Sequence, residues 1–167
     1  RAGQQTLRRR DGDGPLLAQL MGFEEAAAPI PVAARTTTPV TGEWEWELKS
    51  VDAEGDARTE REEWHLTEDA QGITGWYERR VMRQRGDGVF SCNGRRESQT
   101  DTRYEIRGHR FGDRVTLTET SFRAEPDRCD NGQRRLDVYQ GSVGRTGDEL
   151  VLTWGAGNQV LHRRAAN

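Results

Sequence analysis

From Thr41 onward, hydrophobic and polar residues alternate with a period of two, which is the pattern of half-buried β-strands. Eight segments carry this pattern, and short stretches with Gly, Asp or Asn separate them. Several strands at this spacing are typical of an all-β sandwich or barrel. We predict an eight-stranded antiparallel up-and-down barrel, with strands near 43–50, 58–67, 72–83, 98–108, 113–123, 134–143, 149–154 and 158–164.

The composition fits a barrel better than a large solid core. Of the 167 residues, 32% are hydrophobic and another 32% are charged. A sheet closed on itself needs few apolar residues, because every second side chain faces water. Five tryptophans can supply much of the core volume. The net charge of −3 argues against general binding to nucleic acid. No apolar run reaches the roughly 18 residues of a transmembrane helix.

Residues 1–40 differ from the rest of the chain. Apolar residues recur there at helical spacing, and a stretch rich in Ala, Pro and Thr follows. We expect an N-terminal arm over residues 1–40 that carries one short helix, and a barrel domain over residues 41–167. The arm would dock onto another protein through residues 15–40. The candidate docking residues are Leu16, Leu17, Leu20, Met21 and Phe23.

The two cysteines of the chain fall opposite each other in the register that we predict for one hairpin. If Ile106 lies across from Val115, the same register continued outward brings Cys92 across from Cys129. We therefore predict a disulfide; the alternative is two unrelated buried thiols. Disulfides persist in the periplasm or outside the cell, so we expect a periplasmic or extracellular protein. The chain starts with Arg rather than Met, which is expected after signal-peptide cleavage or after an artificial truncation.

Several charged side chains point into the predicted barrel. We expect Glu60 to lie across from Arg79, and Trp64 across from Gly75. The charged pair either contacts a polar ligand at one mouth or closes that mouth as an ion pair, since unpaired burial is costly. The candidates for the barrel interior or a ligand site are Trp44, Trp46, Glu60, Glu62, Trp64, Tyr77, Arg79, Tyr104, Glu119, Trp154 and Arg163.

Both ends of the predicted barrel carry short motifs of a known family. Gly42-Glu43-Trp44 resembles the glycine-x-tryptophan motif of lipocalins and their calycin relatives, and residues 72–77 resemble a strand of avidin-type barrels. In that family an arginine of the last strand packs across the first-strand tryptophan. Arg163 is the matching inward residue when Leu152 lies across from Leu161. The resemblance implies a ligand-holding interior but no particular ligand.

The chain shows no motif for catalysis or for binding a cofactor or a metal. The three histidines are far apart, and no nucleophile elbow or phosphate-binding loop is present. We therefore expect no enzyme, cofactor or metal. One interpretation is a structural or interaction subunit of a larger assembly, and the other is a lipocalin-like carrier of a small molecule. An empty cavity larger than a few waters favours the carrier, and packed aromatic residues favour the assembly subunit.

Overall fold

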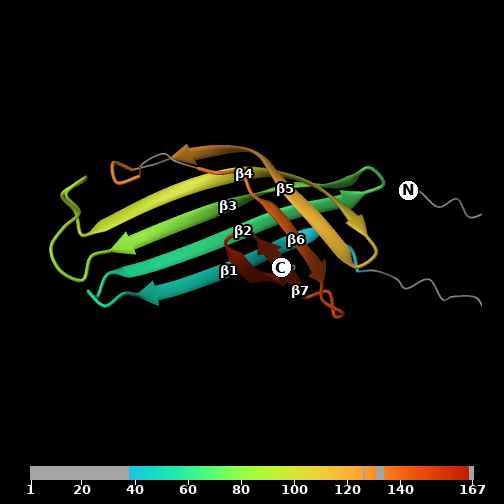
Figure 1. Cartoon of the computed structure of the whole chain (residues 1–167), viewed down its shortest axis with the longest axis horizontal. Coiled ribbons are helices and arrows are strands. Elements are labelled where there is room, and N and C mark those ends of the chain that lie inside the picture. Colours follow the sequence, from blue (N-terminus) through green and yellow to red (C-terminus); the bar gives the residue numbers. More distant parts are fainter. Residues whose placement is uncertain (1–37, 126, 131–133, 166–167) are drawn as a thin grey trace, which may run out of the picture. The chain divides into compact units, whose positions relative to one another are not determined.

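The computed structural model describes residues 38–125, 127–130 and 134–165. Its eight strands form one closed antiparallel barrel, in which neighbours in sequence pair and β1 also pairs with β8 (Figure 1). The predicted all-β up-and-down architecture is confirmed, and it is compatible with a calycin-like fold. The strands are β1 Gly42–Val51, β2 Ala57–Asp69, β3 Gly72–Gln84, β4 Glu97–Phe111, β5 Arg114–Glu125, β6 Val138–Val143, β7 Glu149–Trp154 and β8 Gly157–Arg163.

The predicted N-terminal helix and its docking residues lie outside the described part of the chain. Among the described residues, no helix is long and apolar enough to cross a membrane. Residues 38–40, which we assigned to the arm, contact the barrel. Val40 is fully buried, and its carbonyl oxygen accepts a hydrogen bond from Nε1 of Trp44.

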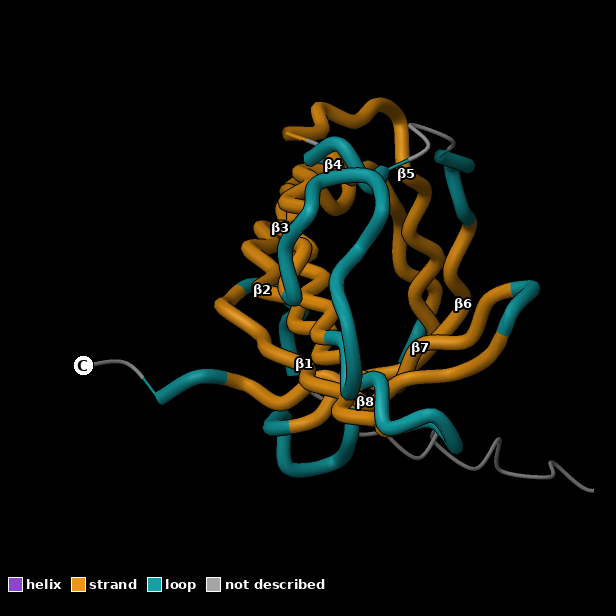
Figure 2. Tube along the Cα trace, turned by 90° about the vertical axis from the view of Figure 1, so that its left-hand side faces the viewer, coloured by secondary structure: helices purple, strands orange, loops and turns teal. Residues whose placement is uncertain are grey.

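The strands differ in length, so the barrel has a wide end and a narrow end. Strands β1–β5 have 10 to 15 residues, whereas β6–β8 have 6 or 7. Strand β6 pairs with β5 only through Arg114–Thr118. The long strands therefore continue past the closed part of the barrel as a curved sheet (Figures 1 and 2). The wide end is where β2 begins and β3 ends. The narrow end holds the β2–β3 and β4–β5 turns.

Stacked aromatic rings fill the closed part of the barrel. The rings of Trp64 and Tyr77 are stacked at 4.0 Å between centroids, and those of Tyr77 and Tyr104 at 4.7 Å. Tyr139 packs edge-on against Trp64 at 5.5 Å. Burial of these large side chains is the main favourable contribution to folding. The other buried hydrophobic residues are Val40, Trp44, Leu66, Ile73, Ile106, Val115, Leu117, Leu150, Leu152 and Leu161.

The predicted register of the β2–β3 hairpin is wrong by two residues. Trp64 lies across from Tyr77 rather than from the predicted glycine, and Glu60 lies across from Val81 rather than from the predicted arginine. Both strands continue to a tight turn at residues 70–71, which is shorter than the sequence pattern suggests. Because the shift is even, every side chain keeps its predicted face.

The register that led to the disulfide is also wrong, although the disulfide is present. Ile106 lies across from Glu119 rather than from the predicted valine, because β4 and β5 continue to a turn at residues 112–113. Cys92 and Cys129 lie in loops beyond the paired strands, and they are bonded with a Cα–Cα distance of 5.2 Å. The loops, rather than the extrapolated ladder, bring the two thiols together.

The last hairpin closes the barrel at the narrow end. Leu161 lies across from Leu150 rather than from Leu152, and this shift of two residues again preserves the predicted faces. Arg163 is therefore turned inward and is the direct cross-strand partner of Trp44. Its guanidinium lies over the indole ring, so the predicted stack is confirmed.

The first strand leaves the core halfway along its length. Alternation predicts that Trp44, Trp46 and Leu48 all face the core. Trp44 is fully buried and Trp46 is partly buried against the core, but Leu48 is 48% exposed. The reason is that β8 pairs with β1 only through Trp44 and Glu45, so Leu48 has a neighbouring strand on one side only.

Candidate ligand site at the wide end of the barrel

A cavity of about 440 Å³ opens on the inner face of β2, β3 and β4 at the wide end. This volume lies within the range of about 300–1,000 Å³ that is typical of small-molecule pockets. The strands contribute Arg58, Glu60, Arg79, Val81, Arg83, Thr100, Thr102 and Tyr104. The segment between β5 and β6 contributes Cys129, Asp130, Arg134, Arg135 and Asp137. Below we call it the wide-end cavity.

Arg79 connects the wide-end cavity to the buried core. Its Nε donates a hydrogen bond to Oε1 of Glu62 at 2.7 Å and lies 3.4 Å from Oε1 of Glu60. Its guanidinium carbon is 5.6 Å from the ring centroid of Tyr77 and 5.5 Å from that of Tyr104. Its two Nη nitrogens donate to no residue in the described part of the chain. They can therefore donate two parallel hydrogen bonds to a carboxylate or phosphate.

The position of Arg79 is set by Glu62, which is fully buried. Besides Arg79, Nε1 of Trp64 donates to this carboxylate at 2.9 Å, and Nε2 of Gln159 donates at 3.1 Å. A buried carboxylate is tolerated only when it is paired and hydrogen-bonded. Burial acts to lower the pKa of Arg79, but the Glu62 carboxylate and the neighbouring tyrosines together act to raise it, and the pKa lies above its ordinary value. The arginine is therefore permanently charged.

A second buried carboxylate, that of Glu119, supports the wall of the wide-end cavity that is formed by the segment between β5 and β6. Glu119 is 3% exposed and accepts hydrogen bonds from the hydroxyl groups of Tyr77 and Tyr139. Its other oxygen accepts the backbone N–H of Asp137 at 2.7 Å, which ties the segment before β6 to β5. Burial raises the pKa of Tyr77 and of Tyr139, so both phenols stay protonated and can donate.

A β-bulge in β5 turns an aromatic residue toward the inner face of the sheet. The ladder between β4 and β5 shifts between Glu105 and Ile106, leaving Thr120 without a cross-strand partner. Residues after the bulge change face, so Phe122 lies across from Tyr104, with 6.0 Å between the ring centroids. Simple alternation would place Phe122 outside. No turn residue or glycine in the sequence indicates the bulge.

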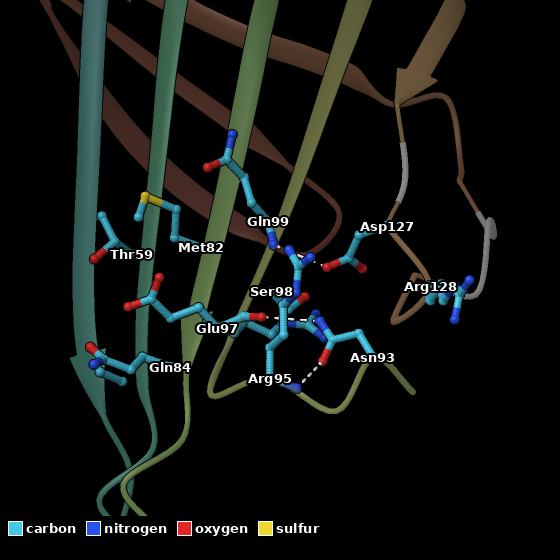
Figure 3. A pocket seen from close by; sticks show the side chains of 12 residues that line it. Thr59, Met82, Gln84, Asn93, Arg95, Glu97, Ser98, Gln99, Asp127 and Arg128 are labelled. Carbon is cyan, nitrogen blue, oxygen red and sulfur yellow. Dashed lines mark hydrogen bonds between the residues drawn. The ribbon is translucent and has the colours of Figure 1, made fainter. Parts of the chain in front are cut away.

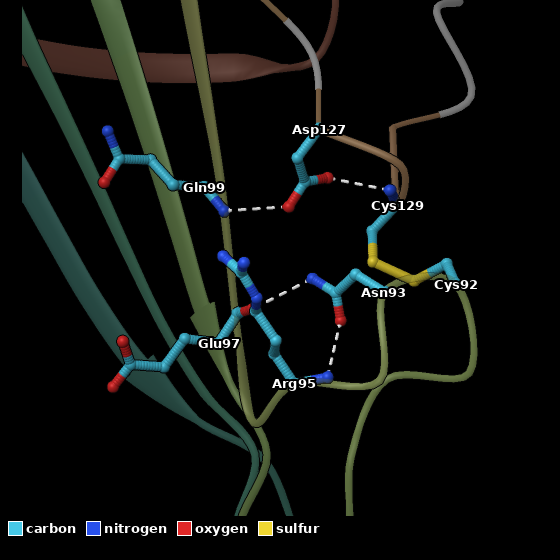
Figure 4. The surroundings of a disulfide bond; sticks show 7 residues. All are labelled: Cys92, Asn93, Arg95, Glu97, Gln99, Asp127 and Cys129. Atoms are coloured by element: carbon cyan, nitrogen blue, oxygen red, sulfur yellow. Dashed lines mark hydrogen bonds between the residues drawn. A yellow bond between two sulfur atoms is a disulfide. The ribbon is translucent and has the colours of Figure 1, made fainter.

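The disulfide between Cys92 and Cys129 (Figure 4) lies beside the wide-end cavity, because Cys129 is one of the residues that line it. It joins the β3–β4 loop to the segment after β5, across a sequence separation of 37 residues. The carboxylate of Asp127 accepts the backbone N–H groups of Gln99 and Cys129, which fixes that segment beside the start of β4. Because Cys129 lines the cavity, the bond stabilises the wall directly.

A larger hollow of about 760 Å³ lies on the outer side of the same strands (Figure 3). Its walls are Thr59, Met82, Gln84, Glu97 and Gln99 from outward-facing strand positions, together with Ala57, Arg83, Asn93, Arg95, Ser98, Asp127 and Arg128. The loop side chains are used locally: Asn93 accepts the backbone N–H of Arg95 and donates to the carbonyl of Glu97. No aromatic side chain lines this hollow, so we regard the wide-end cavity as the candidate site.

The structure separates the predicted interior residues into three groups. Glu60, Arg79 and Tyr104 line the wide-end cavity. Glu62, Trp64, Tyr77 and Glu119 form the hydrogen-bonded and stacked layer that supports it. Trp44, Trp46, Trp154 and Arg163 belong to the core or the narrow end and do not line it.

Several residues of the site were missed by the sequence analysis. Alternation along β2 and β3 could have identified Arg58 and Arg83, which occupy inward positions at the wide end. The pattern gave no means of identifying Arg134 and Arg135, because they lie in a loop and not in the strand predicted over residues 134–143. Tyr139 was missed because Val138 beside it leaves the parity of β6 ambiguous.

Comparison of the chain with models of known protein families, with curated proteins and with solved structures finds no match. Among the described residues, no group of three or more His, Cys, Asp or Glu side chains is placed to hold a metal ion. The geometry of the wide-end cavity is therefore the basis for a functional conclusion.

Proposed function

We propose that this protein is a calycin-like binding protein that holds a small ligand with a carboxylate or phosphate group in the wide-end cavity. The observation that carries the proposal is the arrangement of Arg79. Its Nε is held by buried Glu62, its guanidinium carbon lies 5.6 and 5.5 Å from the ring centroids of Tyr77 and Tyr104, and its remaining donors face no described partner. A guanidinium fixed in this way binds an anion with little loss of conformational entropy.

The charge of the cavity supports an anionic ligand. Five arginines and three carboxylates line it, although the whole chain carries a net charge of −3. Arg83 and Arg135 are exposed and form no ion pair with any described residue. A concave site with a local excess of one charge concentrates ligands of the opposite charge.

The other walls suit a small ring or a short chain attached to the anionic group. The partly exposed Val81 offers an apolar surface, and the hydroxyl group of Thr100 offers hydrogen bonds. The aromatic stack beneath them leaves the free space at the wide end rather than in the barrel centre. Such a cavity favours a small polar ligand over a long lipid chain.

The disulfide supports a location in an oxidising compartment, and we propose the periplasm or the extracellular space. The predicted role as an assembly subunit that docks onto another protein through residues 15–40 stays a prediction, because residues 15–37 lie outside the described part of the chain. The wide-end cavity, in contrast, is formed by described residues, and it is the site that we propose for ligand binding.

Isothermal titration calorimetry with matched probes tests the proposal. We expect benzoate and phenyl phosphate to bind, and the uncharged analogue benzamide to bind at least roughly tenfold more weakly, because a hydrogen bond to a charged group contributes more. Added salt should weaken the binding of the anions. Equal affinity for benzoate and benzamide would contradict the proposal.

Three variants localise the binding. Arg79→Lys keeps a charge beside Glu62 but lacks the planar fork, so we expect lost affinity for both anions. Arg83→Gln lies at an exposed rim position and should weaken binding without affecting folding. Arg114→Gln is the control, since this exposed arginine starts β5 at the narrow end. An effect of the control equal to that of Arg83→Gln would place binding elsewhere.

A further inference from the structure

One edge of β1 has no partner among the described residues. Strand β1 pairs with β2 along its whole length, but with β8 only through Trp44 and Glu45. Residues 46–51 therefore have β2 on one side and no described strand on the other (Figure 1). Residues 47–51 are all exposed. An unpaired edge of this kind is a template for adding another strand.

The backbone groups at this edge belong to odd-numbered residues. In antiparallel sheets, the N–H and C=O groups of successive residues point alternately to the two neighbouring strands. The carbonyl of Glu43 accepts the backbone N–H of Arg164 at 2.9 Å, so odd-numbered residues of β1 face the β8 side. Beyond the point where β8 pairs with β1, the backbone N–H and C=O groups that point to the free edge belong to Glu47, Lys49 and Val51.

The side chains at this edge are complementary to themselves. Glu47 and Lys49 flank Leu48, and they already form an ion pair within the strand. If a second copy pairs antiparallel about Leu48, each Glu47 lies across from the Lys49 of the other copy as a hydrogen-bonded pair. The two Leu48 residues then form the central non-hydrogen-bonded pair, in which side chains approach most closely. The direction of the backbone hydrogen-bonding groups and the charges of Glu47 and Lys49 therefore favour the same register.

We propose that two copies of this chain associate through the free edge of β1, as a two-fold symmetric extension of the antiparallel sheet. Charged residues commonly protect sheet edges from pairing. Here the two charges have opposite sign and lie two residues apart, so the antiparallel arrangement satisfies both. Leu48, which is 48% exposed in one copy, becomes covered by its equivalent. The contact uses the same patch on both copies, as a closed dimer requires.

The composition of the chain allows a direct test of this contact. Lys49 is the single lysine in the sequence. A carbodiimide joins a carboxylate to a neighbouring amine as an amide, with the loss of one water. In a mixture of ¹⁴N- and ¹⁵N-labelled full-length chains, we expect peptide mapping to find Glu47 of one copy linked to Lys49 of the other. A link found only within one copy would overturn the proposal.

Sedimentation velocity of charge variants gives an independent test. We expect Lys49→Glu to weaken the dimer roughly tenfold, since two like-charged cross-strand pairs replace two ion pairs. The double swap Glu47→Lys with Lys49→Glu should restore association. Arg107→Glu, which changes the net charge equally at an exposed position of β4, should leave it unchanged. A wild-type chain that stays monomeric, or a double swap that stays as weak as Lys49→Glu, would overturn the proposal.

A proline substitution separates backbone pairing from charge. The N–H of Lys49 points to the free edge, so Lys49→Pro removes an edge donor without removing a hydrogen bond to β2. We expect the variant to keep the β-sheet circular dichroism spectrum of the wild type and to sediment as a monomer. Retained dimerisation in a folded Lys49→Pro variant would exclude pairing through this edge.

Discussion

The guanidinium carbon of Arg163 lies 4.1 Å from the ring centroid of Trp44, and the two residues are direct cross-strand partners between β8 and β1. The same guanidinium donates hydrogen bonds to the carbonyl oxygens of Pro39, Thr41 and Gly147, at 2.6 to 2.9 Å. Because β1 and β8 share only two backbone pairs, this side chain supplies much of the contact that closes the barrel.

Replacing Arg163 by Ala should lower the free energy of unfolding by about 2–4 kcal/mol, because it removes a cation–π contact and three charge-assisted hydrogen bonds. Urea unfolding followed by tryptophan fluorescence measures the change. Arg164→Ala is the matched control, since its exposed ion pairs are 3.7 Å or longer and should contribute less than about 1 kcal/mol. Equal effects of the two substitutions would show that the closing contact is not important.

Removing the disulfide should lower the free energy of unfolding by about 4 kcal/mol in the chain-entropy model, given the 37-residue separation. We expect the double variant Cys92→Ser with Cys129→Ser to keep its β-sheet circular dichroism spectrum but to bind benzoate more weakly, because one cavity wall is released. Mass spectrometry after alkylation under non-reducing conditions should find no free thiol in the wild type. Two alkylated cysteines would contradict the structure.

Glu62 and Arg79 should be energetically coupled. We expect Glu62→Ala to cost about 3–5 kcal/mol, because it leaves the Arg79 guanidinium, the Trp64 indole N–H and the Gln159 amide without their shared acceptor. Adding Arg79→Ala should cost less in this background than in the wild type. Denaturant unfolding of the four proteins gives the coupling energy. Additive effects would contradict a buried ion pair.

The tyrosines predict a loss of stability at alkaline pH. Tyr77, Tyr104 and Tyr139 are all the tyrosines of the chain, and burial raises the pKa of each above the ordinary value of 10.0. Above pH ~10 the unfolded chain loses phenol protons that the folded barrel retains, so the free energy of unfolding falls as the pH rises. Below pH ~9 these groups should cause no change.

Absorbance at 295 nm measures this tyrosine ionisation. In the folded chain we expect no tyrosinate signal near pH 10, and a signal that rises only with unfolding. The chain unfolded in guanidinium chloride is the control, and it should titrate near pH ~10. A tyrosine that ionises near its ordinary pKa while the circular dichroism spectrum stays native would contradict the buried network.

Truncation should show where the barrel begins. Val40 is fully buried, and its N–H donates to the carboxylate of Glu68 at 2.9 Å. We expect a chain lacking residues 1–40 to be less stable by about 2–4 kcal/mol than one lacking residues 1–37, because it loses a buried valine and several hydrogen bonds. Thermal unfolding followed by circular dichroism compares the two. Equal stability would place residues 38–40 outside the barrel fold.

Most of the architecture could be predicted from the sequence, whereas the pairing of individual residues could not. The period-two pattern places Trp64, Tyr77 and Tyr104 inside the barrel, and the structure agrees. The registers were wrong by two or four residues because strands continue into the turns, and turn length is set by local backbone geometry. An even shift leaves each face unchanged, so the errors did not affect which residues are inside.

The sequence by itself determined that the chain forms an alternating sheet closed on itself, with charged residues such as Arg163 inside, and the resemblance to calycins implied that Arg163 packs over Trp44. Only the tertiary structure decided where those charges meet. Arg79 is held by Glu62 because residues far apart in sequence, Gln159 and Trp64 among them, converge on one carboxylate. The alternation of polar and apolar residues assigns a side chain to a face of the sheet. It does not show how far each strand continues past the closed part of the barrel. The difference in strand length between β1–β5 and β6–β8 is what opens both the cavity and the free edge of β1.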